Sequence, residues 1–167
     1  MHRYIIWNAA MPTTAAPVKV TTGTAIKTML QLASPATRGF EVVEWGFSLD
    51  AASAAVAVVE LLQTDVAATV TAHSASGVMP LDAGLPASLL TLGTSATGFT
   101  ATAEGSTTAT RVFDAKEIPI AAGLTDLDYR RVFLPRYRPI VPVSKFLRVR
   151  CTFTSATNML CYVIIDE

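Results

Sequence analysis

GFEVVEWGFSLDAASAAVAVVELL, residues 39–62, is the stretch that decides the fold class of this chain. Its first half places large apolar residues at alternate positions, namely Val43, Trp45, Phe47 and Leu49. A period of two is typical of a strand with one buried face. Three valines follow within residues 56–59, and β-branched residues favour extended structure. We therefore predict a core strand and a second strand that folds back on it. An alanine-rich helix capped by Asp50 is the alternative for the second segment.

The same alternation returns on both sides of this stretch. Residues 24–32 alternate Ile26, Thr28, Leu30 and Leu32 with Lys27, Met29 and Gln31, which predicts another strand. Residues 97–101 and 108–112 flank a turn at Gly105 and predict a hairpin. The closing run MLCYVII, residues 159–165, is apolar on both faces and predicts a buried final strand. The pattern therefore indicates an all-β chain.

The segments between these strands read as turns and one long connection. Residues 63–92 carry Gly77, Pro80, Gly84 and Pro86, which are turn residues, and a short helix near residues 65–70 is expected there. A further turn is expected at Gly123. We find no internal repeat and predict one domain over residues 18–167 that is preceded by an N-terminal arm over residues 1–17.

Composition and charge narrow the possible functions. The chain has 167 residues, a formal net charge of zero and only 16% charged residues, below the usual quarter of charged residues. We expect partners to cover much of so weakly charged a surface. A neutral chain gives no electrostatic case for nucleic acid as the main partner. No apolar run approaches the roughly 18 residues that a membrane span requires. The apolar run near the N-terminus is too short for the core of a signal peptide. We expect synthesis in a cytoplasm.

Two segments carry the residue types that protein interfaces favour. The arm contains an aromatic and aliphatic run at Tyr4, Ile5 and Trp7, although a first edge strand closing its own sandwich explains that run as well. Residues 128–150 hold seven of the 13 basic residues, with interleaved aromatics and three prolines. The prolines favour an extended edge or a crossing arm, and arginine with tyrosine favours a protein contact. The candidate interface residues are Tyr4, Ile5, Trp7, Arg130, Arg131, Arg136, Tyr137 and Arg138.

Alternatives stay open for the basic segment. An ordinary solvated edge, with arginine stems covering apolar surface, explains its composition about as well as an interface does. Basic side chains with interleaved aromatics also track single-stranded nucleic acid in other proteins, but no nucleic-acid-binding signature accompanies them here.

The chain shows no set of residues for catalysis, cofactor binding or metal binding. Cys151 and Cys161 read as two reduced core thiols, although a hairpin that turns near Ala156 would place them opposite each other. His73 lies among polar neighbours and reads as a loop histidine, with no GxSxG turn in the chain. No recognised metal-ligand spacing is present. We therefore do not expect an enzyme or a cofactor.

Five stretches of the chain resemble small structural proteins from the head genes of tailed actinobacterial bacteriophages. They are VKVTTGTAIKTMLQLASPATRGFEVVEWGFSLD, VELLQTDVAATVTAH, PASLLTLGTSATG, AEGSTTATRVFDA and VSKFLRVRCTF. Proteins of that kind look like capsid decoration, or cement, proteins. The resemblance implies a β-sandwich, commonly trimeric, that sits on the outside of an icosahedral shell and bridges major capsid subunits. It implies no catalytic residues.

The sequence therefore predicts an antiparallel β-sandwich, jelly-roll-like, that acts as a non-enzymatic structural protein of a virion. Its expected partners are the major capsid protein and further copies of itself in a trimer, with no direct contact to nucleic acid or membrane. Two alternatives stay open: a phage tail or head-to-tail connector component, and a glycan-binding β-sandwich. The last would need exposed aromatics in a groove.

Overall fold

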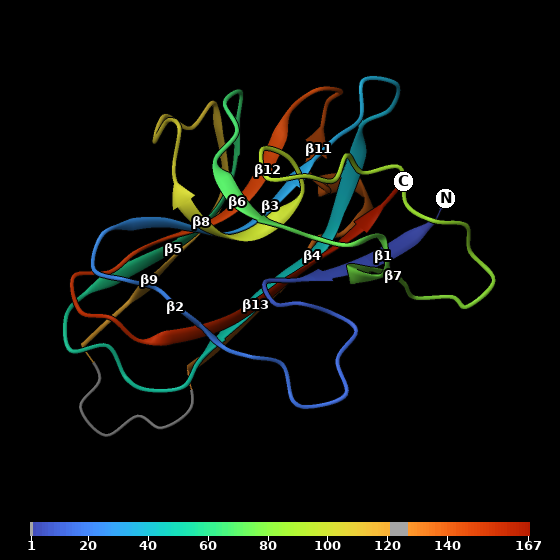
Figure 1. Ribbon diagram of the computed structural model, residues 1–167. Helices are drawn as coiled ribbons and strands as arrows, with labels where there is room; N and C mark the ends of the chain where they lie inside the picture. The colour runs from blue at the N-terminus through green and yellow to red at the C-terminus, as the bar shows by residue number, and fades with distance from the viewer. Residues whose placement is uncertain (1, 121–126) are drawn as a thin grey trace.

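The computed structural model describes residues 2–120 and 127–167, and within them every regular element except two 3-10 turns is a strand (Figure 1). The strands form two sheets in which all neighbours pair antiparallel. The prediction of an all-β antiparallel sandwich is confirmed. The jelly-roll connectivity stays a prediction. The expected turn at Gly123 lies outside the described residues.

The first sheet, sheet A, contains the final strand of the chain near its centre. Its order is β10 (Leu127–Val132), β4 (Phe40–Leu49), β13 (Asn158–Asp166), β1 (Arg3–Trp7) and β7 (Val78–Pro80). Two short strands extend it: β11 (Ile140–Val141) pairs with β4, and β2 (Val20–Thr21) pairs with β13.

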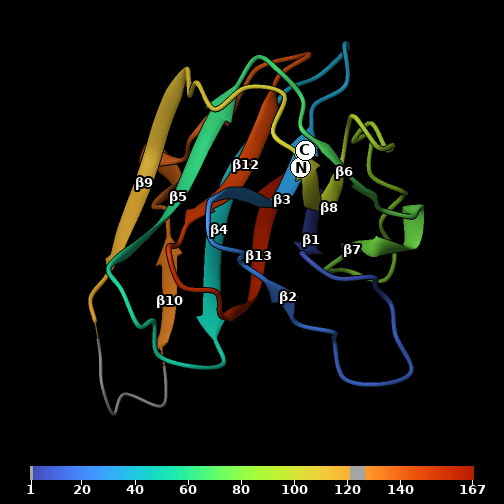
Figure 2. The same cartoon turned by 60° about the vertical axis from the view of Figure 1, so that its left-hand side comes forward.

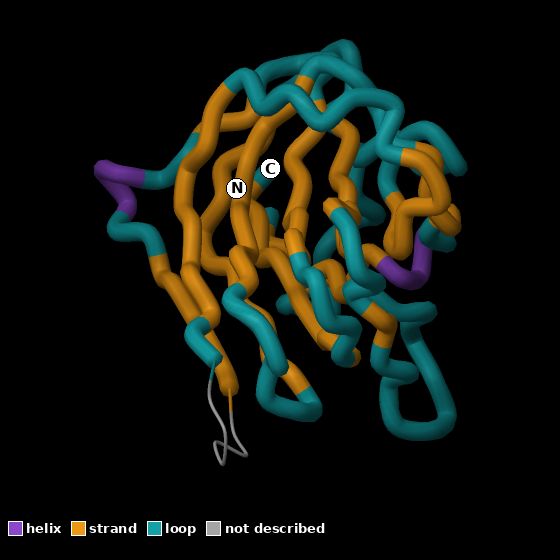
Figure 3. Tube along the Cα trace, turned by 90° about the vertical axis from the view of Figure 1, so that its left-hand side faces the viewer, coloured by secondary structure: helices purple, strands orange, loops and turns teal. Residues whose placement is uncertain are grey.

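The second sheet, sheet B, faces sheet A across the core, as Figure 2 shows. Its order is β6 (Thr69–Ala72), β8 (Gly98–Ala103), β3 (Ile26–Ala33), β12 (Phe146–Thr152), β5 (Ala57–Thr64) and β9 (Arg111–Ile118). The 3-10 turns η1 (Ala75–Gly77) and η2 (Pro135–Tyr137) lie on opposite sides of the sandwich (Figure 3).

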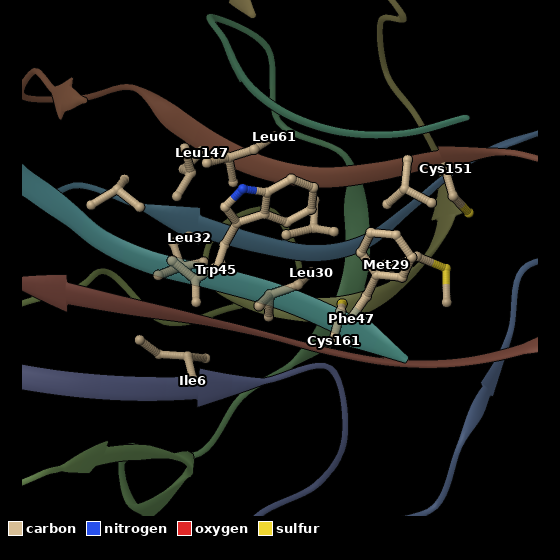
Figure 4. Close-up of a cluster of buried hydrophobic side chains, with 14 of the residues drawn as sticks. Ile6, Met29, Leu30, Leu32, Trp45, Phe47, Leu61, Leu147, Cys151 and Cys161 are labelled. Atoms are coloured by element: carbon tan, nitrogen blue, oxygen red, sulfur yellow. The ribbon is translucent and has the colours of Figure 1, made fainter. Parts of the chain in front are cut away.

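The core fills the space between the two sheets (Figure 4). Three of the four alternating residues of β4 that the sequence singled out, Trp45, Phe47 and Leu49, are buried there, with Phe47 packed against Trp45 at 5.8 Å between ring centroids. The fourth, Val43, is buried outside this cluster, because the pairing of β4 with β13 shifts register there and places Val42 in the core instead. Leu61 and Leu147 meet them from sheet B. Burial of one large apolar side chain contributes about 1.5–3 kcal/mol, so this interior is the main source of stability.

Both cysteines belong to this core as free thiols, which confirms the prediction of reduced side chains. Cys151 lies on β12 and Cys161 on β13, in different sheets. The chain between them crosses the sandwich instead of turning as a hairpin. Burial raises the pKa of the Cys151 thiol to about 12, so it stays protonated and unreactive at neutral pH.

Three local predictions are wrong: two concern strand partners and one concerns a short helix. The segment after Asp50 is a strand, β5, but it joins sheet B while β4 belongs to sheet A. Strands β8 and β9 do not form a hairpin, because β8 pairs with β3 and β6 and β9 pairs with β5. The expected helix near residues 65–70 is a turn followed by β6. Alternation reveals which face of a strand is buried but not which strand lies beside it.

The pairing of β6 with β8 has a local cause in Gly98. A Cβ atom at this position would lie 2.3 Å from the carbonyl oxygen of Thr71. The missing side chain therefore allows the two backbones to approach, which is a common reason for glycine within a strand.

The N-terminal segment is a strand inside sheet A, so the expected arm is corrected for residues 3–7. Strand β1 pairs with β13 on one side and β7 on the other. Tyr4 and Ile6 are fully buried, and the Tyr4 hydroxyl donates to the carbonyl of Pro86 at 2.9 Å. Deletion of these residues would remove a paired interior strand, so such a truncation tests folding and not attachment.

A buried polar layer lies on the outer face of sheet B around Arg148. This side chain is fully buried on β12. Its Nε donates to Gln31 Oε1 at 3.0 Å, and its Nη1 donates to Glu104 Oε2 at 3.3 Å and to the carbonyl of Ser106 at 3.1 Å. Its Nη2 donates to the carbonyl of Val66. One guanidinium therefore ties two loops, after β5 and after β8, to the centre of the sheet.

Candidate functional site

The structure places the first part of the basic segment, residues 128–141, along one edge of sheet A, while Phe146 and the residues after it form the interior strand β12 of sheet B. Strand β10 pairs with β4, and after η2 the short strand β11 pairs with the same edge of β4. Among the described residues, β10 has no partner on its other side. The side chains of this segment nevertheless differ in what they do, because three of its four candidate arginines are engaged within the molecule.

Arg131 braces the two sheets against each other. Its Nη1 donates to Asp114 Oδ1 on β9 at 2.8 Å. The other carboxylate oxygen of Asp114 accepts from Trp45 Nε1 at 3.0 Å and from the Tyr129 hydroxyl at 2.8 Å. Asp114 is buried, and a buried carboxylate is stable there because several donors surround it. Arg131 is therefore a structural residue that closes the sandwich beside β10.

Arg130 lies on the outer face of sheet A and binds Glu44. Its Nε and Nη2 contact the two carboxylate oxygens at 2.6 and 2.9 Å, and the Tyr162 hydroxyl donates to the same carboxylate. Burial raises the pKa of Glu44, but the hydrogen bonds from Arg130 and Tyr162 outweigh it, so the pKa lies below its usual value. Burial and the bond to Glu44 raise the pKa of Tyr162. The Arg130–Glu44 ion pair is charged at neutral pH, and it holds the Arg130 side chain in one position.

Arg138 joins the two chain ends through Asp166. Its Nη1 lies 2.7 Å from Asp166 Oδ2, and Arg3 contacts the same carboxylate with Nε at 2.7 Å and Nη2 at 2.8 Å. The hydrogen bond from Arg3 is the main reason that the pKa of Asp166 lies below its usual value. The group is buried, so it holds β1, β13 and the residues before β11 together.

We expect this carboxylate to make stability fall in acid. Because the pKa of Asp166 is lower in the folded than in the unfolded chain, its stabilisation is complete above about pH 4 and is lost as the pH falls through the folded pKa. Urea unfolding over a pH series should show the decline, and Asp166→Asn should make it shallower. Parallel curves for the variant and the natural chain would contradict this assignment.

Besides the partly exposed side chains of Arg130 and Arg131, the segment exposes apolar side chains. Four side chains on or beside β10, η2 and β11 are mostly in solvent: Val132 (54%), Leu134 (65%), Tyr137 (70%) and Ile140 (56%). We call these four residues the edge patch. Because β10 and β11 share one edge of β4, Val132 and Ile140 lie on that edge, and η2 projects between them from the side of the sandwich (Figure 3). Exposed Arg136 lies in the same turn.

Sequence reasoning located this edge but not its chemistry. Of the eight candidate interface residues, Arg136 and Tyr137 are exposed in the edge patch region, and Ile5 and Trp7 are half-buried on the outer face of sheet A. Tyr4 is in the core, and Arg130, Arg131 and Arg138 form internal ion pairs. The aliphatic members Val132, Leu134 and Ile140 were missed. Leu134 and Ile140 are each adjacent to a proline in the sequence, and that position was their signal.

The described residues offer little support for other kinds of site. No group of three or more histidine, cysteine, aspartate or glutamate side chains among them is placed to hold a metal ion. Within the same residues, no helix has the length and apolar character that crossing a membrane requires. His73 lies in the loop between β6 and η1, as expected, but it is buried, with Nε2 at 2.7 Å from the carbonyl of Trp7 and its ring against Phe99.

Comparisons with protein-family models, with curated protein sequences and with solved structures find no match to this chain.

Proposed function

We propose that this protein is a structural, non-enzymatic component of a virion that decorates an icosahedral phage capsid and bridges its major capsid subunits. The observation that carries the proposal is the edge patch, an exposed apolar surface on the edge of sheet A where β10 has no further partner among the described residues. Apolar and aromatic side chains of this kind are frequent at the centres of protein interfaces. We infer the partner, the major capsid protein, from the resemblance of five sequence stretches to capsid decoration proteins.

The mechanism we propose is attachment through this edge. Strand β10 offers unpaired backbone groups that an extended segment of a neighbour is able to pair with. The edge patch beside it supplies buried apolar area once a partner covers it. Three or more copies in one oligomer would bind several capsid subunits at once, so weak single contacts combine into firm attachment. The protein would then resist expansion of the shell.

The electrostatics of the edge favour a protein partner over nucleic acid. Arg130, Arg131 and Arg138 are bound to carboxylates of the same chain. These pairs leave the basic segment with much less free positive charge than its composition suggests. Affinity for a phosphate backbone depends on such free charge. These three arginines therefore stabilise the fold and contribute little to binding of nucleic acid.

Density-gradient fractionation of the native source, with quantitative mass spectrometry of each fraction, tests this function. We expect the protein to travel with DNA-filled particles in a simple ratio to the major shell protein, at hundreds of copies per particle by order of magnitude. A few copies per particle would indicate a connector or tail component instead. Recovery only as a small species at the top of the gradient would overturn the proposal.

A further inference from the structure

A small hollow on the outer face of sheet A is lined by both aromatic and polar side chains. It has a volume of about 200 Å³. Its lining includes Trp7 from β1, Ser48 from β4, Asp128 and Arg130 from β10, and Leu160 and Tyr162 from β13. Pockets for drug-sized ligands are roughly 300–1,000 Å³, so this hollow has room for one small ring rather than a large cofactor.

Two aromatic side chains form its apolar part. Trp7 and Tyr162 are directly opposite each other on paired strands, with ring centroids 4.9 Å apart and planes at 42°. Tyr162 lies across Gly46 of β4, where a Cβ atom would come within 2.9 Å of its Cε1. Its hydroxyl donates to Glu44 beyond that glycine. The aromatic surface is therefore held in position before any ligand arrives, which lowers the entropic cost of binding.

The polar part combines donors and acceptors at the rim. Asp128 and Ser48 are paired residues on β10 and β4, and both are exposed to solvent. Arg130 is two residues from Asp128 on the same face of β10, and Glu44 fixes its guanidinium. A carboxylate accepts hydrogen bonds, a guanidinium donates them and a hydroxyl does both. These groups thus suit a ligand that carries several hydroxyls.

We propose that this hollow binds one ring of a neutral saccharide. The C–H face of a sugar ring packs against the negative face of an aromatic ring, here Trp7 and Tyr162, while its hydroxyls bond with Asp128, Ser48 and Arg130. The negative charge of Asp128 disfavours acidic sugars and phosphorylated ligands. This site uses none of the edge patch residues and does not rest on attachment to a capsid.

Titration of the ¹⁵N-labelled protein with maltose, cellobiose, lactose and N,N′-diacetylchitobiose tests the proposal by NMR. The chain has two tryptophans: Trp7 lines the hollow, while Trp45 is buried and bonded to Asp114. We expect at least one sugar to move the Trp7 indole signal and leave that of Trp45 unchanged, with a dissociation constant of about 1 mM. Trp7→Ala and Asp128→Ala should each weaken binding about tenfold or more.

Leu134→Ala is the matched control, because it changes the edge patch and should leave sugar binding unaltered. Asp128 is exposed, so its variant is expected to fold and isolates the polar contribution even if Trp7→Ala perturbs β1. An unmoved Trp7 signal with every sugar overturns the proposal. A Trp7 shift that Asp128→Ala leaves intact overturns it as well. Particle binding is a separate measurement, so either proposal is able to fail alone.

Discussion

Replacement of Arg148 by methionine is expected to lower the free energy of unfolding by about 3–5 kcal/mol, the usual cost of breaking a buried ion pair by removing one partner. The guanidinium is fully buried and donates to Gln31, to Glu104 and to the carbonyls of Ser106 and Val66. Methionine fills a similar volume but donates no hydrogen bond. The carbonyl groups of two loops would then lose their shared partner, and an unsatisfied buried group costs about 1–3 kcal/mol.

Urea unfolding followed by circular dichroism measures this effect. Arg148→Lys keeps one charge but not the fork of donors, so it should recover only part of the loss. Arg136→Met is the matched control, because Arg136 is exposed in η2 and surface changes usually stay within about 0.5 kcal/mol. A loss below about 1 kcal/mol for Arg148→Met would show that the polar layer is not a structural centre.

The double substitution Leu134→Asp and Tyr137→Asp is expected to weaken attachment to capsid particles by at least about 100-fold. Residues at the centre of an interface commonly contribute about 2 kcal/mol or more each, and 1.4 kcal/mol corresponds to a tenfold change in affinity. Both side chains are mostly exposed, so the free protein should fold and melt as before. Co-sedimentation of purified protein with stripped particles measures the binding.

Leu81→Asp provides the comparison for charge alone. Leu81 is 53% exposed and follows β7, at the opposite edge of sheet A from β10. It should bind particles as the natural chain does. If the double variant bound particles as well as the natural chain, the edge patch would not be the attachment surface. If Leu81→Asp lost as much binding as the double variant, the loss would be a general effect of added charge.

The fold class was predictable because alternation is a local property. The pattern around Trp45 and the run around Leu30 predicted strands that the structure contains as β4 and β3. Strand partners were not predictable, because the same pattern suits a neighbour in either sheet. The chain between β4 and β5 crosses the sandwich, and no residue in it distinguishes a crossing from a hairpin.

The candidate site was only partly predictable for a related reason. The sequence located an arginine-rich edge, but Arg131 meets Asp114 and Arg138 meets Asp166 through contacts set by tertiary structure. Composition does not reveal which arginines are already paired. The aromatic hollow likewise depends on Trp7 and Tyr162, which are distant in sequence and adjacent only because β1 pairs with β13.

A cryo-electron-microscopy reconstruction of the native particle tests the central claim most directly. The account predicts density for this sandwich at regular positions on the outer surface of the shell, with β10, η2 and β11 against a major capsid subunit and the edge patch covered. Absence of the protein from the shell would contradict the proposed function. Its presence with the edge patch facing solvent would contradict the proposed mode of attachment.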